Sequence, residues 1–344
     1  MRALPAGPAR DAQFMALALR QAEKASLEAR PNPRVGCVLV TEEGRIVGRG
    51  VTQAWGGPHA EVMALREAGS MARGATAYVT LEPCNHQGRT GPCTQALMAA
   101  GVVRVVCAAL DPNPGAAGGL KTLAEAGIAT QSGVLEHSAI AQNPGFHRRV
   151  AGGLPWVRLK MASTQDGLSA LPDGRSQWIT GPAARADGHR FRARSCAILT
   201  GSGTVLADQP RLTARGWDIQ RQPLRVVVDR RGRLTGDEAV FAGGEAEAWH
   251  LQGESWTPQR VLKALAEHPC NEVLIEAGPV LSAAWLEAGL VDELILYQNP
   301  SLLGQGRPAL DLPLLAELDQ RWRLQVLDRR QFGEDCRIMA RPVR

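Results

Sequence analysis

One histidine, one glutamate and two cysteines between residues 59 and 93 have the types and spacing of a catalytic metal site. An imidazole and two thiolates suit zinc, and a zinc ion with only three protein ligands keeps its fourth position open for water. We therefore expect His59, Cys84 and Cys93 to bind catalytic zinc. Glu61, two residues after the histidine, is then free to carry protons.

This set of residues indicates hydrolytic deamination. Bound zinc would lower the pKa of a water molecule enough for it to attack an amino-bearing ring carbon. Glu61 is expected to act as general base and then as general acid, passing the proton to the ring nitrogen and to the departing ammonia. The alternative interpretation is a buried histidine, two core cysteines and a solvated glutamate. That explains any one member, but not all of them at helix starts and a strand end.

The elements expected around these residues bring them to one edge of a sheet. The apolar pattern predicts helices over residues 11–27 and 59–68, a hairpin of strands 35–40 and 46–51, strands 76–81 and 102–110, and a helix that starts at Cys93. Cys84 then follows the carboxyl end of a strand, where open α/β sheets bind ligands. The order predicts a three-layer α/β domain that ends near Gly133.

A second α/β domain is expected after a linker. Residues 138–153 contain Asn-Pro-Gly, His-Arg-Arg and Gly-Gly, which is typical either of a linker or of a linker that also packs on the first domain, so we predict domains at residues 1–150 and 151–344. Strands are predicted at 156–162, 197–200, 224–229 and 272–275, and helices at 182–192 and 276–287. Gly201 to Thr204 reads either as a tight surface turn or as part of a cofactor loop. Arg230 and Arg231 either select the extra phosphate of NADPH or form a charged hairpin tip.

Composition narrows the class of protein. The 344 residues carry a net charge of +5 and only 4% aromatic side chains, which disfavours a stacking surface for single-stranded nucleic acid and suits phosphorylated small molecules. The seven scattered cysteines indicate a reducing compartment, and no signal peptide or membrane span is predicted. We expect a cytoplasmic protein that binds a small molecule, neither nucleic acid nor membrane. A homo-oligomer is compatible with the sequence.

Several strings resemble the bifunctional deaminase/reductase family of riboflavin biosynthesis. They are Pro31–Gly36, Pro58–Glu61, Leu81–Thr90, Ser176–Thr180, Gly203–Asp208 and Glu276–Val280. Eight residues separate Cys84 from Cys93, unlike the Cys-x-x-Cys of nucleic-acid deaminases. The resemblance implies a cytidine-deaminase-like zinc domain followed by a dihydrofolate-reductase-like α/β domain. It implies deamination of 2,5-diamino-6-ribosylamino-4-pyrimidinone 5'-phosphate, then NADPH-dependent reduction of the ribosyl group to ribityl.

The same resemblance implies roles for individual residues. Those implied to hold substrate are Asn32, Arg89 and Asp111 in the first half, and Ser176, Arg192, Leu212, Arg215 and Glu276 in the second. Those implied to line the NADPH site are Ala162, Trp178, Thr204, Asp208, Gly278, Pro279, Val280, Leu281, Ser282, Ala283 and Ala284. The alternative for each arginine is a solvated surface charge, and for Trp178 ordinary core packing.

The chain also departs from the family pattern. Thr52 stands where the family usually has a histidine, and it can form hydrogen bonds but cannot become cationic. Gln165, Leu168 and Gln209 are further departures in the second half, which bear on reductase rate and substrate fit. Three alternatives therefore stay open: an active deaminase with an impaired reductase, a nucleic-acid-editing deaminase with an accessory domain, and a nucleotide sensor without turnover.

Overall fold

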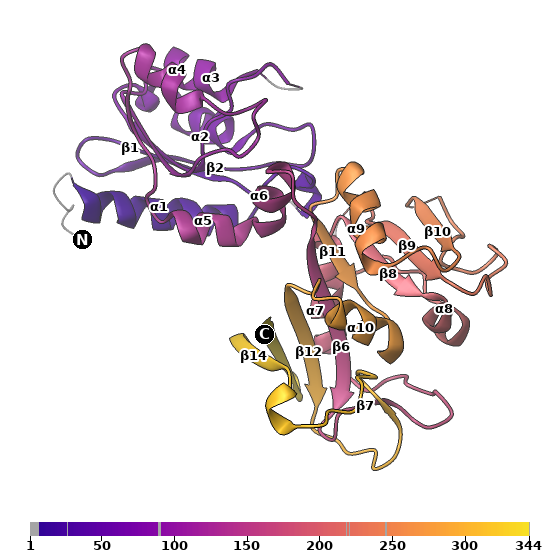
Figure 1. Ribbon diagram of the computed structural model, residues 1–344. Helices are drawn as coiled ribbons and strands as arrows, with labels where there is room; N and C mark the ends of the chain where they lie inside the picture. The colour runs from indigo at the N-terminus through magenta and orange to yellow at the C-terminus, as the bar shows by residue number, and fades with distance from the viewer. Residues whose placement is uncertain are drawn as a thin grey trace. The chain divides into compact units, whose positions relative to one another are not determined.

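The computed structural model describes residues 7–25, 27–88, 91–217, 219, 221–244 and 246–343. The chain divides into two compact units, Met1–Gly153 and Leu154–Arg344, and each has its own large sheet (Figure 1). Within the described residues, no helix has both the length and the apolar character needed to cross a membrane.

The first unit is a mixed sheet between two layers of helices. Its strands are β1 (Gly36–Val40), β2 (Ile46–Val51), β3 (Thr76–Leu81), β4 (Arg104–Ala109) and β5 (Ala129–Gln131), in the order β2-β1-β3-β4-β5. Its helices are α1 (Pro8–Ala22), α2 (Ala60–Ala68), α3 (Cys93–Ala99), α4 (Gly119–Glu125), α5 (Glu136–Gln142) and α6 (Pro144–Val150), with 3-10 turns η1 (Leu27–Ala29) and η2 (Gly69–Ala72). Strand β1 is antiparallel to β2 and β3, whereas β3, β4 and β5 are parallel. Helices α1 and α5 lie on one side of the sheet, and α2, α3 and α4 on the other (Figure 1).

Helix α1 packs on the sheet as its apolar pattern predicts, but it is shorter at its C-terminus than predicted. Phe14, Met15 and Ala18 are buried against the sheet, as their helical spacing predicts. The helix ends at Ala22 and not near residue 27. Beyond it the backbone hydrogen bonds change from the i to i−4 spacing of an α-helix to the i to i−3 spacing of a turn, as where the N–H of Lys24 donates to Gln21 O at 2.8 Å.

The segment predicted as a linker belongs to the first unit. Residues 136–150 form α5 and α6, and Ala139 and Phe146 are buried in the core of the unit. The side chain of Asn143 accepts from the N–H of Arg34 and donates to its carbonyl, each at 2.9 Å. The prediction that the domain ends near Gly133 was therefore wrong. The proline at residue 144 occupies the first position of a helix, where proline is favoured.

The second unit is built on an eight-stranded sheet, in the order β10-β9-β8-β11-β6-β12-β15-β14. Its strands are β6 (Trp156–Thr164), β8 (Ala197–Gly201), β9 (Leu224–Asp229), β10 (Ala248–Gln252), β11 (Glu272–Ile275), β12 (Glu293–Asn299), β14 (Arg323–Phe332) and β15 (Asp335–Val343); β7 (Leu168–Ala170) pairs separately with β13 (Arg307–Pro308). Its helices are α7 (Pro182–Arg194), α8 (Ser202–Asp208), α9 (Pro258–Glu267) and α10 (Pro279–Glu287), with the 3-10 turn η3 (Leu318–Gln320). The strands from β10 to β12 along the sheet are parallel, and β15 and β14 continue it in antiparallel pairs.

Helices cover both faces of this sheet. On one face, Phe191 of α7 packs with Leu274 and Ile295, and Val205 of α8 packs with Ile198. On the other face, α9 and α10 pack over Val273 and Ile275. The tight surface turn considered for residues 201–204 is not present, because α8 begins at Ser202. The fold therefore consists of two α/β units, as predicted, and in each of them helices cover both faces of a central sheet.

Candidate active sites

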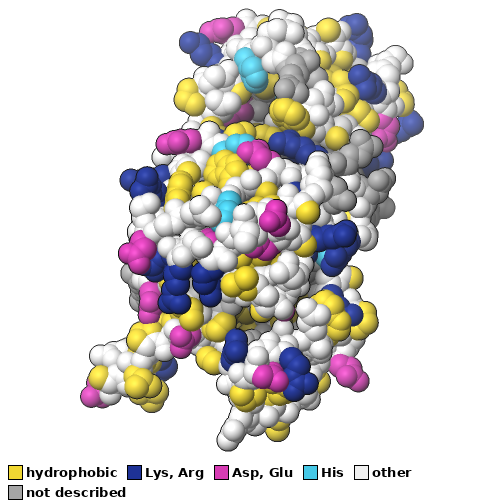
Figure 2. Space-filling view, turned by 90° about the vertical axis from the view of Figure 1, so that its right-hand side faces the viewer, with side chains coloured by type: hydrophobic (Ala, Val, Ile, Leu, Met, Phe, Trp, Pro, Cys, Tyr) yellow, Lys and Arg dark blue, Asp and Glu magenta, His cyan; other side chains and the backbone are white. Residues whose placement is uncertain are grey.

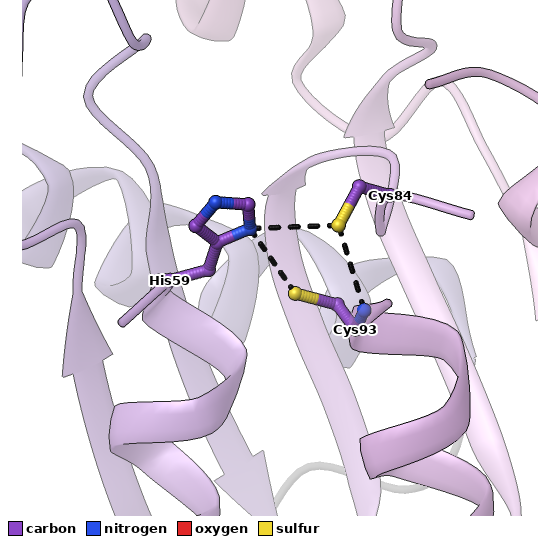
Figure 3. A group of neighbouring side chains, drawn as sticks. All are labelled: His59, Cys84 and Cys93. Atoms are coloured by element: carbon purple, nitrogen blue, oxygen red, sulfur yellow. Dashed lines mark hydrogen bonds between the residues drawn. The ribbon is translucent and has the colours of Figure 1, made fainter. Parts of the chain in front are cut away.

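His59, Cys84 and Cys93 meet at one edge of the first unit (Figure 3). His59 caps the N-terminus of α2, Cys84 follows β3, and Cys93 is the first residue of α3. The Nδ1 of His59 lies 3.5 Å from the Sγ of Cys84 and 3.3 Å from the Sγ of Cys93. The three possible ligand atoms all lie within 4.8 Å of one another.

The chemistry of this donor set fits zinc. Two sulfurs and one imidazole nitrogen form a three-ligand set that leaves a coordination position free. Hydrogen bonds from Cys93 and His59 lower the pKa of Cys84, which favours the thiolate form that metals bind. The backbone N–H of Cys93 also donates to Cys84 Sγ at 3.4 Å.

Glu61 lies in the first turn of α2 beside this cluster, with only 4% of its surface exposed. Burial raises the pKa of Glu61 to about 7, although the charge of His59 opposes the shift. A bound dication would lower the pKa from there. The carboxyl group of Glu61 is thus buried beside the cluster, in a position to accept a proton and to return it.

Two glycines fix the first turn of α2 against the sheet. A Cβ atom at Gly50 would lie 1.9 Å from the carbonyl oxygen of Ala60, and one at Gly48 would lie 2.2 Å from that of Ala64. Any side chain at these two positions would push the helix away from β2. The close approach therefore sets the position of His59 and Glu61.

A cavity of about 360 Å³ opens beside the cluster. Asn32 and Asp111, which the resemblance assigns to substrate, line it together with His59, Glu61 and Cys84. Arg89 lies outside the described residues. The lining residues that sequence reasoning did not select for substrate include Trp55, Glu82, Asn113 and Phe146. The cavity therefore brings two members of the cluster, His59 and Cys84, together with two of the three predicted substrate contacts of this unit.

Glu82 and Asp111 show how the cavity wall is fixed. Glu82 accepts backbone N–H groups from Asp111 at 3.2 Å and from Leu120 at 3.0 Å, which joins the end of β3 to the segment after β4 and to the first turn of α4. Burial raises the pKa of Asp111 to about 6, although the N–H of Asn113 donates to this carboxylate. The only sequence signal for Glu82 is its place in the string next to Cys84.

Thr52, the departure from the family pattern, also lines this cavity. Its hydroxyl accepts from the N–H of Val35 at 2.9 Å and lies 3.2 Å from the carbonyl oxygen of Pro33. This side chain is thus bonded to the backbone on the cavity wall. It supplies no positive charge to a phosphate.

In the second unit, the predicted substrate residues Arg192 and Glu276 form a buried ion pair. The guanidinium of Arg192 donates to both oxygens of Glu276, at 2.6 and 2.8 Å, and to Thr213 O at 3.0 Å. Lys160 Nζ lies 3.9 Å from Glu276 Oε2. Lys160 is a member of this cluster that sequence reasoning did not select. The solvated-charge alternative for Arg192 is therefore wrong.

The other predicted substrate residues of this unit are Leu212, Arg215 and Ser176. Leu212 and Arg215 belong to the segment between α8 and β9, and Leu212 is buried whereas Arg215 is exposed. Ser176 lies between β7 and α7. Of the predicted substrate residues of this unit, Arg192 and Glu276 are the two that hydrogen bonds join directly among the described residues.

The predicted cofactor residues gather mainly where α8 and α10 begin. Gly278 caps α10, and a Cβ atom there would lie 3.7 Å from Thr204 Oγ1 of α8. A Cβ atom at Gly201 would lie 2.9 Å from Leu281 Cδ2, so these two helix starts are in close contact. Ser282 and Ala283 are buried, and Ser282 Oγ donates to Ala277 O at 3.1 Å.

The remaining cofactor residues differ in exposure. Val280 is 68% exposed and lies in the first turn of α10, with Pro279 before it and Ala284 in the next turn. Ala162 is in β6, and Asp208 ends α8. Trp178 is 67% exposed, with the guanidinium of Arg185 at 4.6 Å from its ring, so the core-packing alternative for Trp178 is wrong.

Comparison with known proteins decides the family. Residues 155–338 match the RibD C-terminal domain, and residues 8–109 match the cytidine and deoxycytidylate deaminase zinc-binding region. Riboflavin biosynthesis protein RibD of Escherichia coli is 44% identical over 359 residues, which cover 94% of this chain and 97% of the relative. The chain belongs to the RibD family. The RibD protein of Mycobacterium tuberculosis is 43% identical, with 94% and 95% of the two chains covered.

Solved structures agree with this membership. The chain is 40% identical to Acinetobacter baumannii RibD (form 1), with a TM-score of 0.90 and coverage of 98% of this chain and 100% of that one. It is 33% identical to a deaminase/reductase from Thermotoga maritima, with a TM-score of 0.86 and coverage of 97% and 99%. The predicted family and the predicted pair of folds are therefore confirmed.

The RibD family joins a zinc-dependent deaminase to an NADPH-dependent reductase, so the predicted bifunctional activity and both predicted cofactors are confirmed. A nucleic-acid-editing deaminase with an accessory domain does not account for the RibD C-terminal match. The roles of individual residues, the cytoplasmic location and the oligomeric state stay predictions.

Proposed function

We propose that the first unit deaminates 2,5-diamino-6-ribosylamino-4-pyrimidinone 5'-phosphate and that the second unit reduces the ribosyl group of the product with NADPH. The observation that carries the proposal is the convergence of His59, Cys84 and Cys93 next to a cavity that His59, Cys84 and the buried Glu61 line. The Thermotoga maritima relative bears the name diaminohydroxyphosphoribosylaminopyrimidine deaminase/5-amino-6-(5-phosphoribosylamino)uracil reductase, which supports this substrate.

In the first unit, the protein residues have separate tasks. Zinc bound by His59, Cys84 and Cys93 would supply a Lewis acid and a water molecule of lowered pKa. Glu61 would take one proton of that water and give it to the ring nitrogen, and would then move the proton of the hydroxyl group now on the ring carbon to the amino group, which leaves as ammonia. Asn32 and Asp111 of the cavity wall, and Arg89 outside the described residues, hold the pyrimidine phosphate.

In the second unit, the hydride of NADPH adds to the open-chain ribose carbon. Arg215 binds the phosphate of the substrate, and the paired Arg192 and Glu276 bind its polar groups, with Leu212 and Ser176 as further contacts. The N-terminus of α10, with Gly278 at the N-cap position, would bind the pyrophosphate of NADPH, since helix N-termini favour anions. Residues implied to complete the cofactor site are Ala162, Trp178, Thr204, Asp208 and those from Pro279 to Ala284.

The partners in this proposal are small molecules. On the face drawn in Figure 2, Lys and Arg side chains are interspersed with Asp and Glu side chains, and they do not merge into one basic surface. Such a surface suits phosphorylated metabolites better than a nucleic-acid backbone. A cytoplasmic location and a homo-oligomer remain part of the proposal.

One incubation tests the whole proposal. The protein with zinc, the pyrimidine phosphate and NADPH should release ammonia and oxidise NADPH in equal amounts, and the product should carry a ribityl chain. Ammonia without NADPH oxidation would identify an impaired reductase, as the departures at Gln165, Leu168 and Gln209 allow. Binding without either reaction would identify the nucleotide sensor and contradict the proposal.

A further inference from the structure

The backbone that follows α8 is held by side chains rather than by a strand or helix. Arg192 Nη1 donates to the carbonyl of Thr213 at 3.0 Å. The amide of Gln222 accepts from the N–H of Ala214 at 2.8 Å and donates to its carbonyl at 3.1 Å. Two consecutive residues are therefore fixed by side chains from different parts of the unit.

His189 of α7 extends this hold to the next residue. Its Nδ1 accepts from the backbone N–H of Arg215 at 3.1 Å, and its Nε2 lies 3.5 Å from Nη2 of the same arginine. An imidazole that accepts at Nδ1 is neutral and carries its proton on Nε2. Because Nε2–H and the guanidinium N–H groups are all donors, the approach at Nε2 is not a hydrogen bond, and the ring holds Arg215 through its backbone N–H.

The surroundings keep this imidazole neutral. Burial and the charges of Arg192 and Arg215 lower the pKa of His189 to about 4, although Glu276 and the carbonyl of Thr213 oppose the shift. The Nδ1 lone pair is therefore present as an acceptor at neutral pH.

The segment needs such support because its backbone is strained at Leu212. That residue is buried and has a φ of 52°, in the left-handed region that a branched side chain rarely adopts. A strained conformation of this kind persists only where the surrounding structure holds it in place. The side chains of Arg192, Gln222 and His189 do so, because each forms a hydrogen bond with the backbone of one of the three residues that follow Leu212.

These contacts fix the backbone of Arg215 and leave its guanidinium exposed to solvent. Within the described ranges, no carboxylate forms an ion pair with its exposed guanidinium, whereas Arg192 is engaged by Glu276 and Thr213. A guanidinium fixed at its backbone and without an acidic partner suits an incoming phosphate.

We propose that His189 is a positioning residue of the reductase, which accepts the N–H of Arg215 at Nδ1 and so holds that guanidinium where the phosphate of the substrate binds. The inference rests on the proposed function of the second unit. His189 acts through Arg215 and does not itself contact the reacting atoms.

Three variants of His189 test whether the position of its hydrogen-bond acceptor matters, or only the size of its side chain. His189→Ala should raise the KM for the deaminated pyrimidine phosphate about tenfold, the usual scale for one lost hydrogen bond in a charged site, while the KM for NADPH stays within about twofold. His189→Asn places an oxygen near the position of Nδ1 and should restore most of the lost affinity. His189→Gln places its amide further out and should not.

A double-mutant cycle with Arg215→Ala tests whether the histidine acts through the arginine. The two substitutions should be non-additive in substrate KM, because the second removes nothing once Arg215 has lost its side chain. His268→Asn, a histidine next to Trp249 on another part of the unit, is the matched control and should leave both KM values unchanged. The thermal midpoint of each variant is measured alongside.

The outcomes separate this inference from the proposed function. If Arg215→Ala weakens substrate binding but His189→Ala does not, or if His189→Gln rescues and His189→Asn fails, the positioning role is overturned and the reductase assignment stands. If wild-type protein does not oxidise NADPH with this substrate, or Arg215→Ala leaves its KM unchanged, the proposed substrate site itself is wrong.

Discussion

The carboxylate of Glu276 accepts two hydrogen bonds from the guanidinium of Arg192, at 2.6 and 2.8 Å. The pair joins the carboxyl end of β11 to α7, two elements far apart in the sequence. Both side chains are largely buried, so each depends on the other to offset the cost of its own desolvation. A residue proposed to bind substrate is therefore also part of the fold.

Glu276→Gln should destabilise the second unit as well as impair the reductase. The change leaves the charge of Arg192 buried without its partner, and breaking such a pair costs about 3 kcal/mol or more of unfolding free energy. Urea denaturation at pH 7 measures this loss. Glu334→Gln, an exposed residue after β14, is the control and should change stability by less than about 0.5 kcal/mol. Equal stability of the two variants would contradict the role of the ion pair.

The same pair predicts a pH dependence. Burial alone would raise the pKa of Glu276, but the charge and hydrogen bonds of Arg192 lower it to about 2 from an ordinary value of 4.5. A lowered folded-state pKa gives stability that is fully present above pH 4.5 and is lost as the pH falls toward 2. The stability difference between wild type and Glu276→Gln should therefore shrink over this interval. A difference that is the same at pH 3 as at pH 7 would show that the shift is absent.

Local patterns predicted the zinc cluster because its ligands lie at the ends of elements that the sequence defines well. The strand 76–81 and the helix start at Cys93 match β3 and α3, so the placement of Cys84 and Cys93 followed from short-range signals. Phe146 was missed because α6 was read as a linker from its Gly, Pro and Arg content. Its place at the cavity depends on tertiary packing that no local pattern records.

The second unit was less predictable, because more of its elements and contacts depend on tertiary packing between residues distant in the sequence. Buried parallel strands such as β9 and β11 have continuous apolar runs and were predicted at their observed bounds. The edge strand β14 is mostly exposed along its length and carries no such run. His189 and Lys160 gave no signal, because their importance comes from Arg215 and Glu276, which are distant in sequence.

Glu61→Gln should abolish deamination without loss of zinc. Glutamine has nearly the same shape but cannot accept and return the proton, so the deaminase kcat should fall by about 10²- to 10⁴-fold. Ammonia release measures the loss, and the metal content of the purified protein should match wild type. Glu67→Gln, an exposed glutamate later in the same helix, is the matched control and should keep full activity. Normal ammonia release from Glu61→Gln would remove this residue from the mechanism.

Removal of zinc should separate the two activities. Dialysis against a chelator should stop ammonia release, because both sulfur ligands and the imidazole of the cluster belong to the first unit. NADPH oxidation with an already deaminated pyrimidine should continue, since the proposed reductase residues all lie in the second unit. Added zinc should restore deamination, whereas magnesium should not, because thiolates are poor ligands for magnesium. Deamination that persists in metal-free protein would contradict the zinc site.

Arg230→Ala and Arg231→Ala should weaken the preference for NADPH over NADH. Both side chains are exposed in the turn after β9, and β9 lies next to β8, which leads into α8 with Thr204. Because β9 pairs in parallel with β8 and β10, this turn is not the tip of a hairpin, so that alternative is wrong. The extra phosphate of NADPH would lie within reach of a cation at this edge of the sheet.

The measurement is the ratio of the KM values for NADPH and NADH in each variant. Loss of one charge-assisted hydrogen bond should change this ratio by about tenfold or more, through a higher KM for NADPH alone. Arg329→Ala removes an exposed arginine from β14, several strands away from β9, and should leave the ratio unchanged. If both Arg230→Ala and Arg231→Ala keep the wild-type ratio, these cations are solvated charges and cofactor selection must come from the residues around α8 and α10.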